Sequence, residues 1–138
     1  MDEVAVMDEK TVMDALVQMK RIGNLLNEVE DLTRQLAESI DRNDQVSMSM
    51  LIGMRAEPLQ KLQAADHAVR EQLESISDPD AAAALSAMLN GGTPAEEGDR
   101  IQVMLCEQVA ANRRRLARIM EVDRVLNQRL GREKSAYR

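Results

Sequence analysis

The chain has 138 residues, a net charge of −6, a single Tyr and no Phe or Trp. This length fits one domain spanning residues 1–138, and the negative charge argues against nonspecific binding to nucleic acid or anionic lipid. Because only one aromatic residue is available to fill a core and alternating strand patterns are absent, the composition suits long packed helices better than a β-sandwich and predicts an all-α fold.

The first expected helix spans residues 11–41 and follows a flexible N-terminus at residues 1–10. Its apolar residues recur over eight intervals in 28 residues, a mean spacing of 3.5 that is typical of a coiled-coil seam. An apolar stripe of this length must pack against another helix. The stripe consists of Val12, Leu16, Met19, Ile22, Leu26, Val29, Leu32, Leu36 and Ile40.

The second expected helix spans residues 45–76 and follows the polar segment 41–44, which contains good N-cap residues. The short turn predicts that the first two helices form an antiparallel hairpin. Pro58 should kink the second helix, because proline removes a hydrogen-bond donor and clashes with the preceding turn.

A short third helix is expected at residues 79–89. Asp78 is a good N-cap residue, and Pro79 suits the first helical position because its missing N–H needs no partner there. Asn90-Gly91-Gly92 should end the helix.

The fourth expected helix spans residues 94–136. Thr93 and Glu96 have the spacing of a capping box, although Gly98 can delay the regular start of the helix. The sequence therefore predicts an antiparallel bundle of three long helices and one short helix, held together along coiled-coil-like seams.

Four polar residues interrupt the apolar stripes: Arg55, Asp66, Asn112 and Asp123. Each can fix the register of the helices by pairing across a seam. Alternatively, each marks a place where a seam opens to solvent or to a ligand. We favour pairing, and such polar positions favour a monomer or a weak homodimer.

No plausible catalytic site is present in the sequence. His67 is the only histidine, so the two Glu-x-x-His motifs of a di-iron bundle cannot be formed. Cys106 and His67 make a conceivable dyad, but a single buried thiol usually only packs. A phosphate-binding loop, a Cys-x-x-Cys pair and a serine nucleophile elbow are all missing from the sequence. We expect no enzymatic activity, no metal and no cofactor.

The location of the protein is also constrained by the sequence. The single Cys106 cannot form an intramolecular disulfide, and nothing indicates an oxidising compartment. The acidic N-terminus lacks the apolar segment of a signal peptide, and no apolar run approaches the roughly eighteen residues of a membrane span. We expect a cytoplasmic protein that does not insert into a membrane.

The charges are unevenly distributed along the chain. Residues 1–99 hold 8 Lys and Arg against 20 Asp and Glu, a net charge of −12. Residues 100–138 hold 10 against 4, a net charge of +6. We expect the basic patch at Arg113-Arg114-Arg115 and Arg118 to be a solvated face that pairs with the acidic helices. Binding to nucleic acid would require more basic residues and aromatic residues for stacking.

Methionines are unusually frequent, with ten in the chain, and three of them crowd the start of the second helix. Met48, Met50 and Met54 have flexible, polarisable side chains that can line a groove for varied apolar helices. The alternative is that these methionines simply fill the core. Their clustering within two turns favours a binding groove.

The sequence resembles FlgN-like flagellar export chaperones over nearly its whole length. In that family an acidic turn is followed by a helix of the pattern Leu-Leu-x-x-Arg-x-x-x-Leu-x-x-Leu. The matching segments here are Ile40-Asp41-Arg42-Asn43-Asp44, Met50-Leu51-Ile52-Gly53-Met54-Arg55 and Leu59-Gln60-Lys61-Leu62. The run Asn112-Arg113-Arg114-Arg115-Leu116, continuing to Leu126 and Leu130, resembles the family's closing helix.

The resemblance implies a cytosolic chaperone for flagellar hook-associated or filament-cap proteins. Such a chaperone binds the C-terminal helix of its client and delivers the client to the type III export apparatus. The resemblance places the client-binding residues on the last helix, at Ile119, Val122, Leu126, Leu130 and Tyr137. The alternative is a structural coiled-coil adaptor or dimerisation module without an export role, which would bury its stripes in an obligate oligomer.

Overall fold

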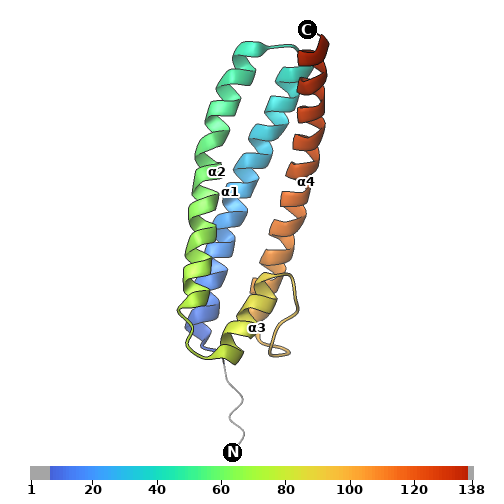
Figure 1. Ribbon diagram of the computed structural model, residues 1–138. Helices are drawn as coiled ribbons and strands as arrows, with labels where there is room; N and C mark the ends of the chain where they lie inside the picture. The colour runs from blue at the N-terminus through green and yellow to red at the C-terminus, as the bar shows by residue number, and fades with distance from the viewer. Residues whose placement is uncertain (1–6, 137–138) are drawn as a thin grey trace, which may run out of the picture.

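The computed structural model describes residues 7–136, with side chains as far as residue 131, and this part of the chain forms four helices (Figure 1). They are α1 (Glu9–Asp41), α2 (Gln45–Glu74), α3 (Pro79–Leu89) and α4 (Arg100–Ala136). The predicted all-α fold with three long helices and one short helix is confirmed.

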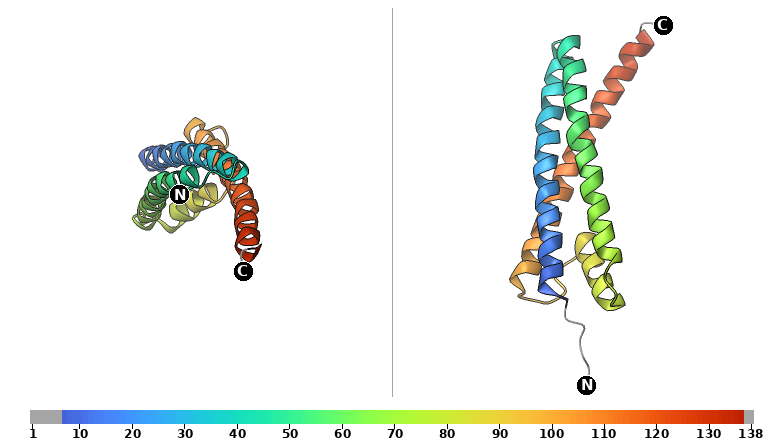
Figure 2. Two further views of the ribbon diagram at one scale, coloured as in Figure 1. Left: turned by 90° about the horizontal axis from the view of Figure 1, so that it is seen from above. Right: turned by 90° about the vertical axis from the view of Figure 1, so that its left-hand side faces the viewer.

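Helix α1 is the central element of the bundle. It packs along both α2 and α4, whereas the backbones of α2 and α4 do not approach each other closely. Helices α1 and α2 run antiparallel, and α3 lies between α2 and α4 at the lower end of the bundle (Figure 1). The C-terminal half of α4 leaves the layer formed by α1 and α2 and projects to one side (Figure 2).

The predicted stripe of α1 forms its packing surface. Seven of its nine residues are buried, because the 3.5-residue spacing keeps them on the side that faces the other helices. They divide among three clusters along α1. The lower cluster includes Val12, Leu16, Leu85, Met88, Leu105 and Val109; the middle cluster is Leu26, Val29 and Ile119; the upper cluster is Leu32, Leu36, Ile40, Leu51 and Leu126.

The start of α1 corrects the expectation of a flexible segment at residues 1–10. Asp8 caps the helix by accepting a hydrogen bond of 3.1 Å from the backbone N–H of Lys10, and the helix begins at Glu9. Met7 is buried in the lower cluster. Residues 1–6 lie outside the described part of the chain.

The start of α4 was predicted six residues too early, and the proposed capping box is wrong. Gly98 has a φ of +83°, which ends any continuous helix from residue 94. Asp99 is the effective cap, because its Oδ1 accepts hydrogen bonds from the backbone N–H groups of Ile101 and Gln102. The Glu96 N–H donates instead to the buried side chain of Gln102 at 2.8 Å.

The other boundaries are close to prediction. Helix α3 spans the expected residues, with Asp78 as its cap and Pro79 in its first turn. Helix α2 starts as predicted, continues through the buried Pro58 and ends at Glu74, two residues earlier than expected. Asp44 caps its N-terminus by accepting a hydrogen bond from the backbone of Ser47.

Candidate helix-binding surface

The first half of α2 exposes an unusual number of large apolar side chains. The exposed fractions are 81% for Val46, 57% for Met50, 53% for Ile52, 51% for Met54 and 39% for Leu59. These residues lie on several sides of the helix, so packing against α1 covers only part of its apolar surface. A helix that is apolar around most of its circumference is normally covered on more than one side. The first half of α2 is therefore the best candidate for a binding surface.

Two of these residues lie on the side of α2 that faces α4. Ile52 precedes Arg55 by three residues and Leu59 follows it by four, so the three side chains share one face of the helix. The guanidinium of Arg55 donates to Oδ2 of Asp123 on α4, which fixes the direction of this face. Ile52 and Leu59 thus border the space between α2 and α4.

Helix α4 contributes matching residues from the opposite side. Leu116 and Met120 precede Asp123 by seven and three residues, so they lie on the face of α4 that carries the ion pair. Their exposed fractions are 45% and 62%. We call Ile52, Leu59, Leu116 and Met120, arranged around the ion pair, the α2–α4 strip.

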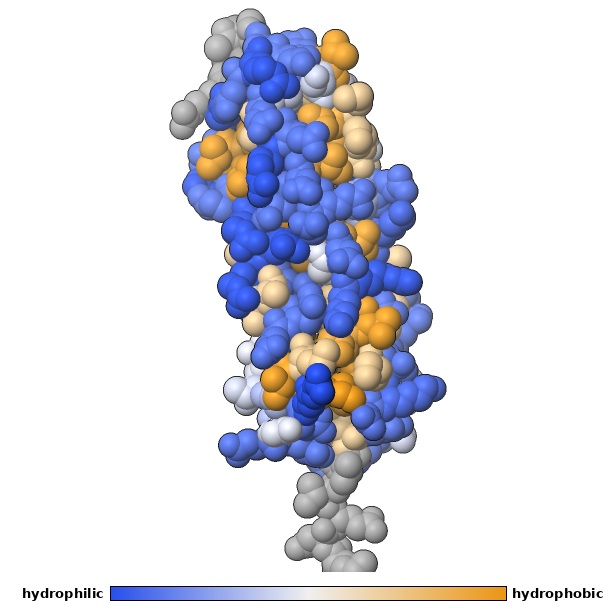
Figure 3. Space-filling view, turned by 180° about the vertical axis from the view of Figure 1, so that it is seen from behind, coloured by the Kyte–Doolittle hydropathy of each residue, from blue (hydrophilic) through white to orange (hydrophobic). Residues whose placement is uncertain are grey.

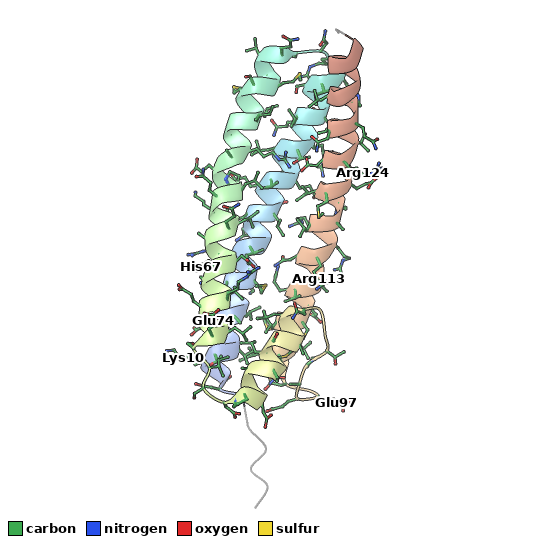
Figure 4. All side chains as sticks on the ribbon, viewed as in Figure 1. Lys10, His67, Glu74, Glu97, Arg113 and Arg124 are labelled. Atoms are coloured by element: carbon green, nitrogen blue, oxygen red, sulfur yellow. The ribbon has the colours of Figure 1, made fainter. Side chains whose placement is uncertain are left out.

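The α2–α4 strip remains open because α3 is too short to cover it. Leu85 and Met88 of α3 fill the lower part of the space between α2 and α4, where both side chains are fully buried. Helix α3 ends beside Arg113, whose Nη1 donates to the carbonyl oxygen of Asn90 at 2.8 Å. Figure 4 shows Arg113 on α4 near this end of α3. The strip begins one turn further along α4.

The polar residues on the apolar stripes behave in two ways. Arg55 and Asp123 pair across α2 and α4, as expected for residues that fix register. Asn112 is buried and donates to the carbonyl oxygen of Met19 on α1 at 2.8 Å. Asp66, in contrast, is exposed and pairs with Arg70 on its own helix.

The predicted methionine groove is divided between two sides of α2. Met48 is half-buried and packs against the upper cluster. Met50 and Met54 are exposed on a different side of the helix. The three methionines therefore do not line one common groove, although all of them belong to the exposed half of α2.

The predicted client-binding residues of α4 are mostly occupied by packing within the bundle. Ile119 is buried in the middle cluster, Leu126 is buried in the upper cluster, and Leu130 is half-buried against the upper cluster. Val122 is 37% exposed and borders a hollow of about 220 Å³ between α1 and α4. Tyr137 lies outside the described residues. In this arrangement, Ile119 and Leu126 hold α4 on α1.

The basic residues of α4 pair mainly with α1. Glu30 lies within 3.7 Å of Arg115 and 3.1 Å of Arg118, and Arg129 pairs with Asp41. The pairing of the basic patch with an acidic helix is therefore confirmed for Arg115 and Arg118. The face of the bundle opposite to the view of Figure 1 shows hydrophobic atoms only as separate patches between hydrophilic side chains (Figure 3).

The residues considered for chemistry lie in ordinary structural environments. His67 is exposed, points away from the bundle and lies 2.9 Å from Glu71 on its own helix (Figure 4). Cys106 packs against the lower cluster, and burial raises the pKa of its thiol, which reduces its nucleophilicity at neutral pH. Among the residues that the structure describes, no three His, Cys, Asp or Glu side chains form a group suited to a metal.

Apolar periodicity along a single helix does not separate the exposed Leu59 and Leu116 from buried residues, so it does not reveal the strip. The available signal was the pair of charged residues on these stripes, because Arg55 and Asp123 lie where the apolar seam opens to solvent.

Within residues 7–136, no helix is long and apolar enough to cross a membrane.

Comparison with known protein families found no matching family model, and comparisons with curated proteins and with solved structures found no significant match.

Proposed function

We propose that this protein is a chaperone that binds an amphipathic helix of a partner protein along the α2–α4 strip. The observation that carries the proposal is the exposure of Ile52, Leu59, Leu116 and Met120 on two helices that face a common, uncovered space. An amphipathic helix is the natural ligand of such a surface, because its apolar face can cover both rows at once.

The resemblance to FlgN-like proteins supplies the identity of the client. We propose that it is a flagellar hook-associated or filament-cap protein, bound through its C-terminal helix and delivered to the export apparatus from the cytoplasm. Covering the apolar face of such a helix prevents premature assembly of the client. The binding requires no catalytic group.

We place the proposed binding surface on the α2–α4 strip rather than on the face of α4 that carries Ile119 and Leu126. Ile119 and Leu126 are buried against α1, so their use by a client would require α4 to detach. Leu116 and Met120 lie on the same helix and are already exposed. Full burial of a fully exposed apolar side chain of this size contributes about 1.5–3 kcal/mol. The four side chains of the strip are already about half covered, so each contributes about half of that amount before the costs of association.

Size-exclusion chromatography with light scattering tests the proposal. The protein is mixed with purified hook-associated and filament-cap proteins, and with the same proteins lacking their C-terminal helix. We expect a discrete complex only with an intact client. Absence of a complex with every one of these clients would contradict the proposed function, and a tight obligate dimer of the chain in that case would favour the adaptor alternative.

Point variants test the location of the surface. Leu59→Glu and Met120→Glu place a carboxylate in the strip, so each should weaken client binding at least about tenfold. Val17→Glu is the matched control, because Val17 is 54% exposed but lies on α1, outside the strip. Equal binding by all three variants would show that the client uses another surface.

A further inference from the structure

The shape of the bundle leaves one half of α2 uncovered and one half of α4 projecting. Figure 2 shows that the C-terminal half of α4 leaves the layer of α1 and α2 on the side of the bundle where α3 lies. The first half of α2, at the same end of the bundle, carries the exposed Ile52 and Leu59. A projecting helix and an uncovered helix side by side are complementary to the same two elements in a second copy of the chain.

The register of the two helices follows from their contacts. Arg55 pairs with Asp123, and Leu51 shares the upper cluster with Leu126, so α2 and α4 run antiparallel. Leu59 lies four residues after Arg55, or about 6 Å along the axis, and Met120 lies three residues before Asp123, or about 4.5 Å in the same direction. Leu59 and Met120 therefore lie at nearly the same height.

We propose that two copies of this chain pair through their α2–α4 strips about a two-fold axis parallel to the helices. A rotation about this axis leaves the position of every residue along the bundle axis unchanged. It places α2 of each copy opposite α4 of the other. Leu59 of one copy then meets Met120 of the other, and the projecting half of each α4 lies over the exposed first half of the other α2. Every contact occurs twice, as in any isologous interface.

The charges of the two helices agree with this arrangement. Asp66 lies eleven residues after Arg55, and Arg113 lies ten residues before Asp123, so both lie about 15–17 Å from the ion pair along the bundle. Asp66 is exposed and pairs with Arg70 on its own helix, and Arg113 is exposed and donates one hydrogen bond to the carbonyl oxygen of Asn90, so each charge still faces solvent. The two-fold axis places Asp66 of each copy at the height of Arg113 of the other, which gives two pairs of opposite charges.

The second copy occupies the surface proposed for the client. Pairing protects the strip from nonspecific association while no client is bound, and a client must displace the second copy. The pairing itself requires no client, so its test is independent of the proposed function. The strip offers only four apolar side chains from each copy. Such a small interface predicts a weak, reversible dimer rather than an obligate one.

Sedimentation velocity over a wide concentration range at low ionic strength tests the pairing. We expect a monomer–dimer equilibrium for the unmodified chain. Asp66→Arg and Arg113→Asp each bring like charges together twice, so each variant alone should dimerise at least about tenfold more weakly. Met120→Glu should do the same, whereas Val17→Glu should leave the equilibrium unchanged.

Mixing the two charge variants gives the decisive measurement. In a mixed dimer of Asp66→Arg with Arg113→Asp, both charge contacts are opposite in sign, so the mixture should recover the dimer that each variant alone has lost. Circular dichroism of each variant confirms that it is folded. A strictly monomeric unmodified chain, or a mixture that associates no better than the separate variants, would overturn the proposal.

Discussion

Gly23 and Gly53 occupy the interiors of neighbouring helices in very different surroundings. A Cβ atom added at Gly23 would lie 2.7 Å from Nε2 of Gln108 and 2.9 Å from Oδ1 of Asn112. Nothing lies within 4 Å of a Cβ atom at Gly53. A side chain at Gly23 would therefore displace the side chains of Gln108 and Asn112 on α4, whereas packing within the chain does not require Gly53.

Alanine substitutions at these two glycines should have opposite effects. Gly53→Ala should raise the free energy of unfolding by about 0.5–1 kcal/mol, because glycine is unfavourable inside a helix. Gly23→Ala should lower it by about 1–3 kcal/mol, since the new methyl group displaces the Gln108–Asn112 hydrogen bond and the bond from Asn112 to Met19. Urea unfolding of the monomer measures both values. Equal effects at the two sites would contradict the described packing of α4 on α1.

Asp44 makes the stability of α2 dependent on pH. The hydroxyl of Ser47 and its backbone N–H donate to the carboxylate, and these hydrogen bonds hold the pKa of Asp44 below its usual value of 3.8. Because the pKa is lower in the folded state, the stabilisation is complete above the unfolded pKa and is lost as the pH falls through the folded pKa.

Asp44→Ala should therefore lower the melting temperature at neutral pH, and the difference from the unmodified chain should shrink below about pH 4. Asp44→Asn is the matched control, because its amide oxygen can still cap the helix without a titratable group. Thermal unfolding followed by circular dichroism at several pH values checks the prediction. A difference that stays constant down to about pH 2.5 would show that the carboxylate charge makes no contribution.

At the scale of helices, apolar periodicity predicts the buried residues well when all the apolar residues of a helix face one direction. The stripe of α1 is contacted by helices along its length, so the 3.5-residue spacing identified its buried residues correctly. Helix α2 is different, because its apolar residues lie on several sides and only some face α1. A pattern along one helix cannot show how many neighbours that helix has, so it cannot show that Leu59 and Leu116 remain exposed.

The predicted start of α4 was wrong for a local reason. Thr93 and Glu96 have the spacing of a capping box, but the backbone at Gly98 turns into a conformation that a helix cannot contain. Asp99 then caps the helix. The sequence contained this alternative, since Asp99 is itself a preferred N-cap residue and directly follows Gly98. The sequence alone cannot decide between a start at Thr93 and a start at Asp99. The deciding contact is tertiary, because the buried side chain of Gln102 accepts the hydrogen bond of the Glu96 N–H.

The Arg55–Asp123 pair is the polar link between α2 and α4. Arg55→Met and Asp123→Leu should each lower the free energy of unfolding by about 1–3 kcal/mol, because each leaves a partly buried charge without its partner. The double variant should lose less than the sum, with a coupling energy of about 1–2 kcal/mol. A double-mutant cycle by urea unfolding measures the coupling. Additive losses would mean that the pair does not link the helices in solution.

At the scale of the molecule, the bundle is incomplete on one side. Helix α1 has a neighbour on two sides, while α3 closes only the lower part of the space between α2 and α4. The upper part carries the α2–α4 strip, where large apolar side chains of two helices remain exposed. In the proposed function, a partner helix completes the bundle in the way that α3 completes its lower end. This incompleteness is the physical basis of the proposed chaperone function.

Hydrogen–deuterium exchange of the protein with and without a purified hook-associated or filament-cap protein tests this claim most directly. We expect a bound client to slow exchange in residues 45–62 of α2 and 113–124 of α4, because the client covers the strip and stabilises both helices. A client without its C-terminal helix should leave exchange unchanged. Protection confined to residues 126–136, or no protection with any of these clients, would contradict the account.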